Sequence, residues 1–387
     1  MFKKNLKWVI LLNIKSYFVV LFVCRIAVFG DTCDFCICCD CCDPNKITDE
    51  DKAITENIFK HLKLDGNNLD NIVNEINTIQ DNEEKIKKII EYSKDIDWEN
   101  ECCPNTLIRW EKNECVIIAY FHLMLNNPYF LKFFLICDKT MCRRKQNKEE
   151  EIEETYVLNA ICDLVRYCVK RPRFKGRYRG SVDNIMKAFF RKEGKEYYYL
   201  KKELSFLEIQ PKRKRRESFL NIYYYGLKNS TGESGNPHTY GGFQGKDIFY
   251  CICLCLLYDL EIKGTDLEEE KGIWQLFPGP ADEKRVNKEN IVKIFSSKEE
   301  DQLPILKTHK LLGVMLYQRD WHVFSLINNN GIWYNKNTLQ EEQCKEMTVN
   351  EILKLFNKIL GIEKINYKDF DKSNCHFLFS KLYEVQN

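Results

Sequence analysis

A histidine and an asparagine mark the two ends of a short segment late in the chain, "WHVFSLINNNGIWYNKN", residues 321–337. Two alternating apolar runs flank three asparagines and a glycine, a pattern typical of a β-hairpin. If those four polar residues form the loop, Ile327 faces Ile332. Counting outward, His322 then lies directly opposite Asn337, on the same face and about 5 Å away. An amide in that position orients an imidazole, so the pair predicts a histidine that acts as a general base.

A thiol beside such a histidine can serve as a nucleophile. Cys115 fits best, because the polar residues "EKNE" precede it and the apolar run "VIIAYFHLML" follows it, as at the start of a buried helix. Free amides at a helix start favour negative charge and can form part of an oxyanion hole. Taken alone, a cysteine such as Cys115 is more often a buried packing residue, and a histidine such as His322 is more often structural than catalytic. With Asn337 they form the Cys-His-Asn order of papain-like proteases.

Helices come first in the chain and strands come last. Residues 47–97 have apolar positions three and four apart, interrupted by "LDGNN", and predict a small helical preface. Buried helices are predicted for the apolar run that ends near Asn127, for "TYVLNAICDLVRYCV" and for 244–262. The hairpin, "KLLGVMLY" and "CHFLFSKLYEV" predict an antiparallel sheet. Helices followed by such a sheet indicate an α+β fold.

The N-terminus bears on the cellular compartment. Residues 1–30 have a basic start and a largely apolar stretch that ends in small residues, which is typical of a signal peptide. Lys15 and Arg25 interrupt the apolar stretch, so a membrane anchor over residues 8–30 is the alternative. Either indicates the secretory pathway, with the protein secreted or membrane-anchored. Six cysteines follow in residues 33–42, and they suit disulfides in a secretory lumen or lipidation at a membrane.

Charge and cysteine spacing argue against several other classes of function. The net charge of +2 gives no strong attraction to nucleic acid. Two basic runs in residues 170–216 favour a solvated loop over a nucleic-acid patch, and no nucleic-acid partner is expected. The cysteine cluster lacks two separated CxxC pairs, so neither a metal site nor a cofactor is expected. Asn229 heads an N-glycosylation sequon, usable only in a secretory compartment.

Four segments, in order, resemble the conserved boxes of ubiquitin-specific proteases. "KNECVIIAYFHLMLNNPYFLKFFL" is similar to the cysteine box, and "GGFQGKDIFYCICLCLLYDL" to the glutamine-aspartate box, with its glutamine at Gln244 and Tyr250 in place of a phenylalanine. "KLLGVMLYQRDWHVFSLINNNGIWYNKNT" is similar to the histidine box, and "CHFLFSKLYEV" to the last strand. The resemblance covers roughly residues 107–385 and identifies the chain as a divergent member of this family.

The resemblance implies a papain-like cysteine peptidase fold over residues 101–387, preceded by a cysteine-rich segment and helical preface over 31–100. It also implies hydrolysis of the isopeptide bond after the C-terminal glycine of ubiquitin or a ubiquitin-like protein. Cys115 would be the nucleophile, His322 would take its proton and pass it to the leaving amine, and Asn337 would hold the imidazole. No CxxC pairs lie between residues 262 and 310, so the zinc-bearing fingers subdomain of the family is expected to be absent or short.

The chain departs from the family around the expected triad. The asparagine that helps to bind the oxyanion is replaced by Trp110, and the glycine three residues before the cysteine by Lys112. Ile118 replaces an asparagine, and Lys246 replaces the aspartate of the glutamine-aspartate box. Loss of one oxyanion donor costs on the order of 100- to 1000-fold in rate.

Three functions are therefore open. The first is an active deubiquitinating thiol protease, and the second is a catalytically degenerate protein that binds ubiquitin or another partner. The third is a secreted cysteine-rich structural or interaction protein without peptidase ancestry. The N-terminal segment conflicts with a cytosolic ubiquitin substrate, unless the chain is an effector secreted into another cell or a membrane-anchored enzyme that faces the cytosol.

Overall fold

The structure is a computed structural model. It describes residues 47–108, 115–142, 156–173, 175–176, 181–189, 191–193, 196–199, 252, 255–256, 259–260, 283–285, 288–295, 298–318, 322–329, 331–337, 346–360 and 376–381. The described residues from Asp49 onward belong to one compact unit. The expected signal or anchor, the cysteine cluster and the sequon lie outside the described residues. In the described ranges no helix is both long and apolar enough to span a membrane.

Three amphipathic helices form the predicted preface: α2 (Asp49–His61), α3 (Asn68–Thr78) and α4 (Asn82–Lys94). Their apolar stripes are buried, with Ile58, Ile76 and Ile89 fully excluded from solvent. The carboxylate of Asp81 caps α4 by accepting a hydrogen bond from the backbone amide of Glu84, 2.8 Å away. Helix α2 packs on α7, and α3 and α4 pack on α6. The sequence prediction of helices in this region is confirmed.

The long apolar run after residue 114 forms two helices rather than one. Helix α5 (Cys115–Met124) ends where predicted, and α6 (Pro128–Thr140) begins three residues after the turn at Leu125. The side chain of Asn127 caps α6 by accepting from the amide of Tyr129 at 3.1 Å, and Pro128 occupies its first position. Helix α6 was not predicted from the sequence. Because α6 is buried on all sides, its sequence has no polar face, and the apolar periodicity that normally marks a helix is missing.

Two further helices and several short elements are described in the same unit. Helix α7 (Val157–Lys170) confirms the prediction from "TYVLNAICDLVRYCV", and α8 (Ser181–Phe189) packs on it. The short elements are η2 (Trp98–Asn100), η7 (Glu299–Asp301), η8 (Pro304–Lys307), β1 (Leu107–Ile108), β2 (Lys175–Gly176), β3 (Lys192–Glu193) and β4 (Glu196–Tyr197). Of the predicted helix 244–262, five residues are described, and Ile252, Cys255, Leu256 and Leu260 are buried in the core.

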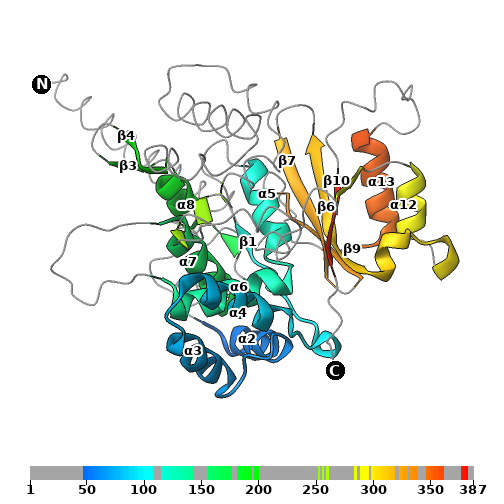
Figure 1. The fold of residues 1–387 in the computed structure, drawn as a ribbon. Coiled ribbons are helices and arrows are strands. Elements are labelled where there is room, and N and C mark those ends of the chain that lie inside the picture. The colour runs from blue at the N-terminus through cyan, green and yellow to red at the C-terminus, as the bar shows by residue number, and fades with distance from the viewer. Residues whose placement is uncertain are drawn as a thin grey trace, which may run out of the picture. The chain divides into compact units, whose positions relative to one another are not determined.

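A six-stranded antiparallel sheet forms the other part, in the order β5-β10-β6-β7-β8-β9 (Figure 1). Its strands are β5 (Glu283–Arg285), β6 (His309–Gln318), β7 (His322–Asn329), β8 (Ile332–Asn335), β9 (Glu346–Met347) and β10 (His376–Lys381). The predicted strands are confirmed, whereas β5 and β9 at the two edges were not predicted, because strands of two or three residues carry no readable alternation.

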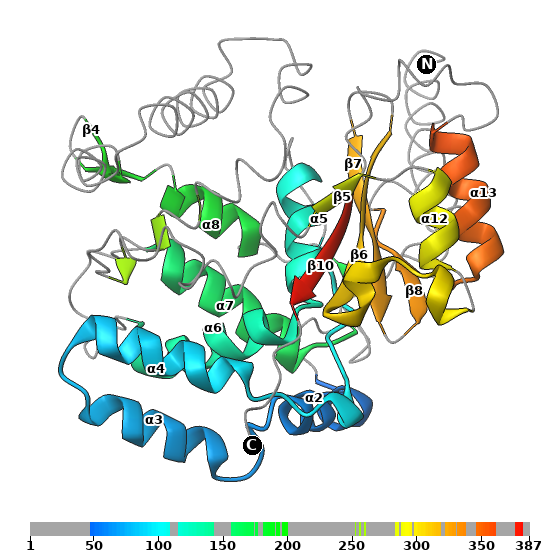
Figure 2. The same ribbon diagram turned by 45° about the vertical axis from the view of Figure 1, so that its right-hand side comes forward.

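Helices cover both faces of this sheet, as Figures 1 and 2 show. Helix α5 packs on β6 and β7, where Val323 and Ile327 join the larger core. On the opposite face, α12 (Lys288–Ile294) and α13 (Val349–Leu360) bury Phe324 and Leu326 in a second core. The alternation along β7 thus separates two cores. The α+β class is confirmed.

Candidate active site

The hairpin of β7 and β8 has a tighter turn than the sequence suggested. Asn329 pairs with Ile332, and Ile327 faces Tyr334 instead of Ile332, so the predicted register is wrong. The reason is the side chain of Asn328, which accepts a hydrogen bond from the amide of Gly331 at 3.0 Å. Gly331 has a φ of +81°, a conformation that glycine adopts without strain. The first two asparagines therefore belong to the ladder and not to the loop.

The predicted contact between His322 and Asn337 nevertheless forms, with 2.9 Å between the imidazole Nε2 and the amide Oδ1 (both residues are at most 2% exposed). The register is shifted by two residues, which keeps every side chain on its predicted face. Beyond β8 the chain turns, because the Asn335 side chain accepts a hydrogen bond from the amide of Asn337 at 2.9 Å. The turn brings Asn337 back to His322 from a diagonal position rather than from directly opposite.

The bond to Asn337 determines which nitrogen of the imidazole carries the proton. The amide oxygen only accepts, so Nε2 of His322 donates, and in the neutral ring Nδ1 holds the lone pair. Burial lowers the pKa of His322 below its usual 6.5, and the hydrogen bond with Asn337 opposes that effect. The ring also stacks on Phe324, with 6.0 Å between the ring centroids. A neutral, oriented imidazole is the form that can accept a proton.

Cys115 is the first residue of α5 and is partly buried. Asn126, just beyond the other end of α5, donates to the carbonyl of Asn328 at 2.6 Å and to that of Leu312 at 2.9 Å. The C-terminal end of α5 is therefore fixed to the turn end of β7. The helix rises about 16 Å from Asn126 back to Cys115, and β7 extends about 20 Å from Asn328 back to His322. Packed side by side, these two elements place Cys115 toward the end of the sheet that holds His322.

Two further basic residues are buried, one on α5 and one directly after β8, and neither was predicted from the sequence. His122 is on the same face of α5 as Cys115, two turns further on, and its Nε2 accepts from the amide of Ile108 at 3.0 Å. Lys336 donates from Nζ to the carbonyl of Thr106 at 3.1 Å. Burial lowers the pKa of His122 well below its usual value, and the charge of Lys336 lowers it further. The seven-residue spacing from Cys115 was a signal for His122, whereas nothing in the sequence marked Lys336.

The remaining residues of the expected site lie outside the described part of the chain. These are Trp110 and Lys112 before the cysteine, and Gln244, Lys246 and Tyr250 in the glutamine-aspartate box. The described residues thus bring His322 and Asn337 into contact and place Cys115 on the helix that packs against their strand. An imidazole oriented in this way can accept a proton from a thiol that reaches Nδ1.

An NMR titration tests the environment of His322. In a Cys115→Ala background, which removes proton exchange with the thiol, we expect the His322 ring to titrate below pH 6.5 because burial disfavours its charged form. Asn337→Ala should lower that midpoint further, since the hydrogen bond from Asn337 raises the pKa. A His322 midpoint above 6.5 would contradict the buried geometry.

The fold and the site define an α+β protein with a buried histidine that an asparagine orients, and with a cysteine at the start of a helix that packs on the same sheet. Comparison with models of protein families, with curated proteins and with solved structures gives no match for this chain.

Proposed function

We propose that the chain is a divergent thiol hydrolase of the ubiquitin-specific-protease type, with a papain-like arrangement of its helices and sheet. The observation that carries the proposal is the 2.9 Å contact between His322 and Asn337 at the base of the hairpin. The pair is buried, as a base that must keep one orientation requires. The four-segment resemblance supplies the substrate class, which is ubiquitin or a ubiquitin-like protein.

In the proposed reaction, Sγ of Cys115 attacks the carbonyl carbon of the C-terminal glycine of the substrate. Nδ1 of His322 takes the thiol proton and then gives it to the leaving lysine amine. Asn337 holds the ring through Nε2 in both steps. Water then hydrolyses the thioester, with His322 again accepting a proton. The free amides at the start of α5 favour the thiolate and the negative charge that develops beside it.

The second candidate is a catalytically degenerate protein of the same fold that binds ubiquitin without cleaving it, as a secreted effector would. The observation that favours it is the replacement of the family's oxyanion-binding asparagine by Trp110 and of the nearby glycine by Lys112. Neither replacement has an amide side chain, so the transition state would lack the amide donor that the family supplies there.

A ubiquitin whose C-terminus carries a thiol-reactive group distinguishes the two candidates. An active enzyme should form one covalent adduct with this probe, at Cys115, and the adduct should be lost in Cys115→Ala. Cys102→Ala is the matched control, because Cys102 is also a partly buried free thiol but lies before α5. We expect full labelling of that variant.

The other outcomes are equally informative. No labelling together with measurable ubiquitin binding would support the degenerate candidate. Labelling at another cysteine, or neither labelling nor binding, would contradict both and favour an interaction protein unrelated to ubiquitin.

A further inference from the structure

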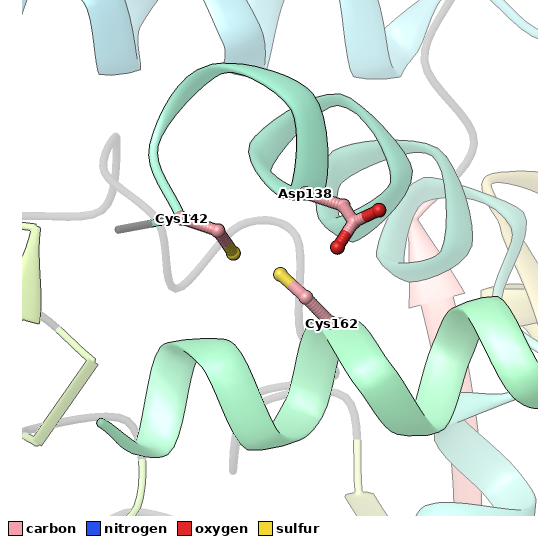
Figure 3. A group of neighbouring side chains, drawn as sticks. All are labelled: Asp138, Cys142 and Cys162. Carbon is pink, nitrogen blue, oxygen red and sulfur yellow. The ribbon is translucent and has the colours of Figure 1, made fainter. Parts of the chain in front are cut away.

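Three potential metal ligands meet between α6 and α7, away from the hairpin. One carboxylate oxygen of Asp138 and the sulfur atoms of Cys142 and Cys162 all lie within 4.8 Å of one another. Figure 3 shows the three side chains directed toward a common point, with Asp138 and Cys142 at the end of α6 and Cys162 on α7. No part of the proposed hydrolase chemistry uses these residues.

The backbone at the end of α6 explains how Cys142 reaches this point. The amides of Met141 and Cys142 both donate to the carbonyl of Cys137, at 2.8 and 3.1 Å. This closing turn keeps the chain wound past the end of the helix, so Cys142 stays on the side of Asp138, four residues earlier. The ligand pair on α6 is thus held by main-chain hydrogen bonds.

Helix α7 supplies the third ligand and a compensating charge. Cys162 and Arg166 are four residues apart on the face of α7 that packs on α6. Nη1 of Arg166 donates to Oδ1 of Asp138 at 2.7 Å and so orients the carboxylate beside the two sulfurs. Hydrogen-bond partners of this kind orient ligands in protein metal sites. Arg166 also contacts Asp163, which is half exposed and solvated.

The donor set and its charge suit a thiophilic divalent cation. Zn²⁺ binds thiolates at about 2.3 Å and carboxylate oxygens at about 2.0–2.2 Å, and tetrahedral geometry then separates two sulfurs by about 3.8 Å. That separation is within the 4.8 Å limit of the three ligand atoms. Two thiolates, one carboxylate, one Zn²⁺ and the Arg166 guanidinium sum to zero charge. A neutral assembly avoids the large cost of an unpaired buried charge.

We propose that Asp138, Cys142 and Cys162 form a binding site for Zn²⁺, with the fourth coordination position open to water. Asp138 and Cys162 are buried, and Cys142 is partly exposed, so the cation enters past Cys142. On binding, the two thiols release two protons and the carboxylate contributes its existing charge. The site ties the end of α6 to α7. No metal site was predicted from the sequence, since these ligands are spaced four and twenty residues apart and form no CxxC pair.

A disulfide between Cys142 and Cys162 is the competing use of the same thiols. It would need an oxidant, such as another disulfide, to accept two electrons and two protons. It would make no use of Asp138, whose carboxylate converges on the sulfurs. The carboxylate therefore favours the cation.

Site-specific alkylation tests the proposal, because the chain has 19 cysteines and total zinc content alone would not locate the ion. The full chain, reduced and stripped of metal, is treated with N-ethylmaleimide with and without Zn²⁺, and the modified peptides are quantified by mass spectrometry. We expect Zn²⁺ to slow alkylation of Cys142 at least tenfold. Alkylation of Cys102, a partly buried free thiol outside the group, should change less than twofold.

Variants identify the ligands. Asp138→Asn and Cys162→Ser should each abolish most of the protection of Cys142 by Zn²⁺. Asp163→Asn is the matched control for Asp138→Asn, since it also removes a partner of Arg166 but no ligand, and it should keep the protection. The zinc content of Cys142→Ser should be one equivalent below that of the unaltered chain, and that of Cys102→Ser should be unchanged.

Three results would overturn the proposal. One is equal slowing at Cys102 and Cys142, which would show non-specific binding to thiols. Another is full protection in Asp138→Asn, which would remove the carboxylate from the site. The last is a Cys142–Cys162 disulfide in the unreduced chain together with no protection by Zn²⁺ after reduction, which would make the pair a redox pair. None of these measurements depends on hydrolase activity.

Discussion

Replacement of His322 by alanine is expected to lower kcat/KM for a fluorogenic amide at the ubiquitin C-terminus by about 10⁴-fold or more, because nucleophile and base act as one unit. The loss follows from the position of His322, which Asn337 orients through Nε2 and which leaves Nδ1 as the proton-accepting nitrogen of the neutral ring. Cys115→Ala should be equally inactive, and combining the two changes should add little.

The same assay separates the base from the residue that orients it. Asn337→Ala removes one buried hydrogen bond of about 1–3 kcal/mol, so the rate should fall only by about 10- to 100-fold. His309→Ala is the matched control, because His309 starts the neighbouring strand β6, and its rate should stay within about twofold of the unaltered chain. Each variant must show unchanged thermal unfolding for the rates to be compared. Near-normal hydrolysis by His322→Ala would eliminate His322 as the base.

Replacement of Gly313 by alanine is the change expected to damage the fold most. A Cβ atom at this position would lie 2.2 Å from the carbonyl oxygen of Leu326 and 2.8 Å from Cδ2 of Leu123. The carbonyl belongs to the paired strand β7 and cannot move without opening the ladder, and Leu123 belongs to α5, which packs on the sheet. We expect a loss of about 3 kcal/mol or more in the free energy of unfolding.

The measurement is the thermal unfolding midpoint, which should fall by roughly 5–10 °C for such a loss in a unit of this size. Gly66→Ala is the control, because Gly66 has a φ of +55° but nothing within 4 Å of its Cβ position. The free energy of unfolding of Gly66→Ala should fall by only about 1 kcal/mol, which is the cost of placing a residue with a Cβ atom in this backbone conformation. Adding Leu123→Ala to Gly313→Ala should restore little, since the clash with the strand remains. Substantial rescue by that change would show that the helix contact, and not the strand, requires the glycine.

The hairpin illustrates how far the sequence leads. Alternating apolar residues predicted which face His322 and Asn337 share, and a register shift of two residues preserved that face. The shift itself depended on the hydrogen bond that the side chain of Asn328 accepts from the amide of Gly331. The sequence has three consecutive asparagines and does not show which of them makes this bond.

In the helical region, the sequence did not show where one helix ends and which helices become neighbours. Asn127 and Pro128 carry the signals of a helix start, yet the apolar residues on both sides concealed the break between α5 and α6. Likewise, the four-residue spacing of Asp138 and Cys142 was visible in the sequence, whereas the contribution of Cys162 depended on how α7 packs. Local signals predict where an element begins, and they do not predict which elements become neighbours.

By itself, the amino-acid sequence determined the α+β class, the preface helices, the main strands and the shared face of His322 and Asn337. These follow from apolar periodicity and turn chemistry, which act over a few residues. Only the tertiary structure decided that Cys115 lies toward the His322 end of the sheet and that Asp138, Cys142 and Cys162 converge. Both outcomes depend on packing between segments far apart in the chain: Asn126 fixes α5 to two strands, through residues 186 and 202 positions further along, and Arg166 joins α7 to α6.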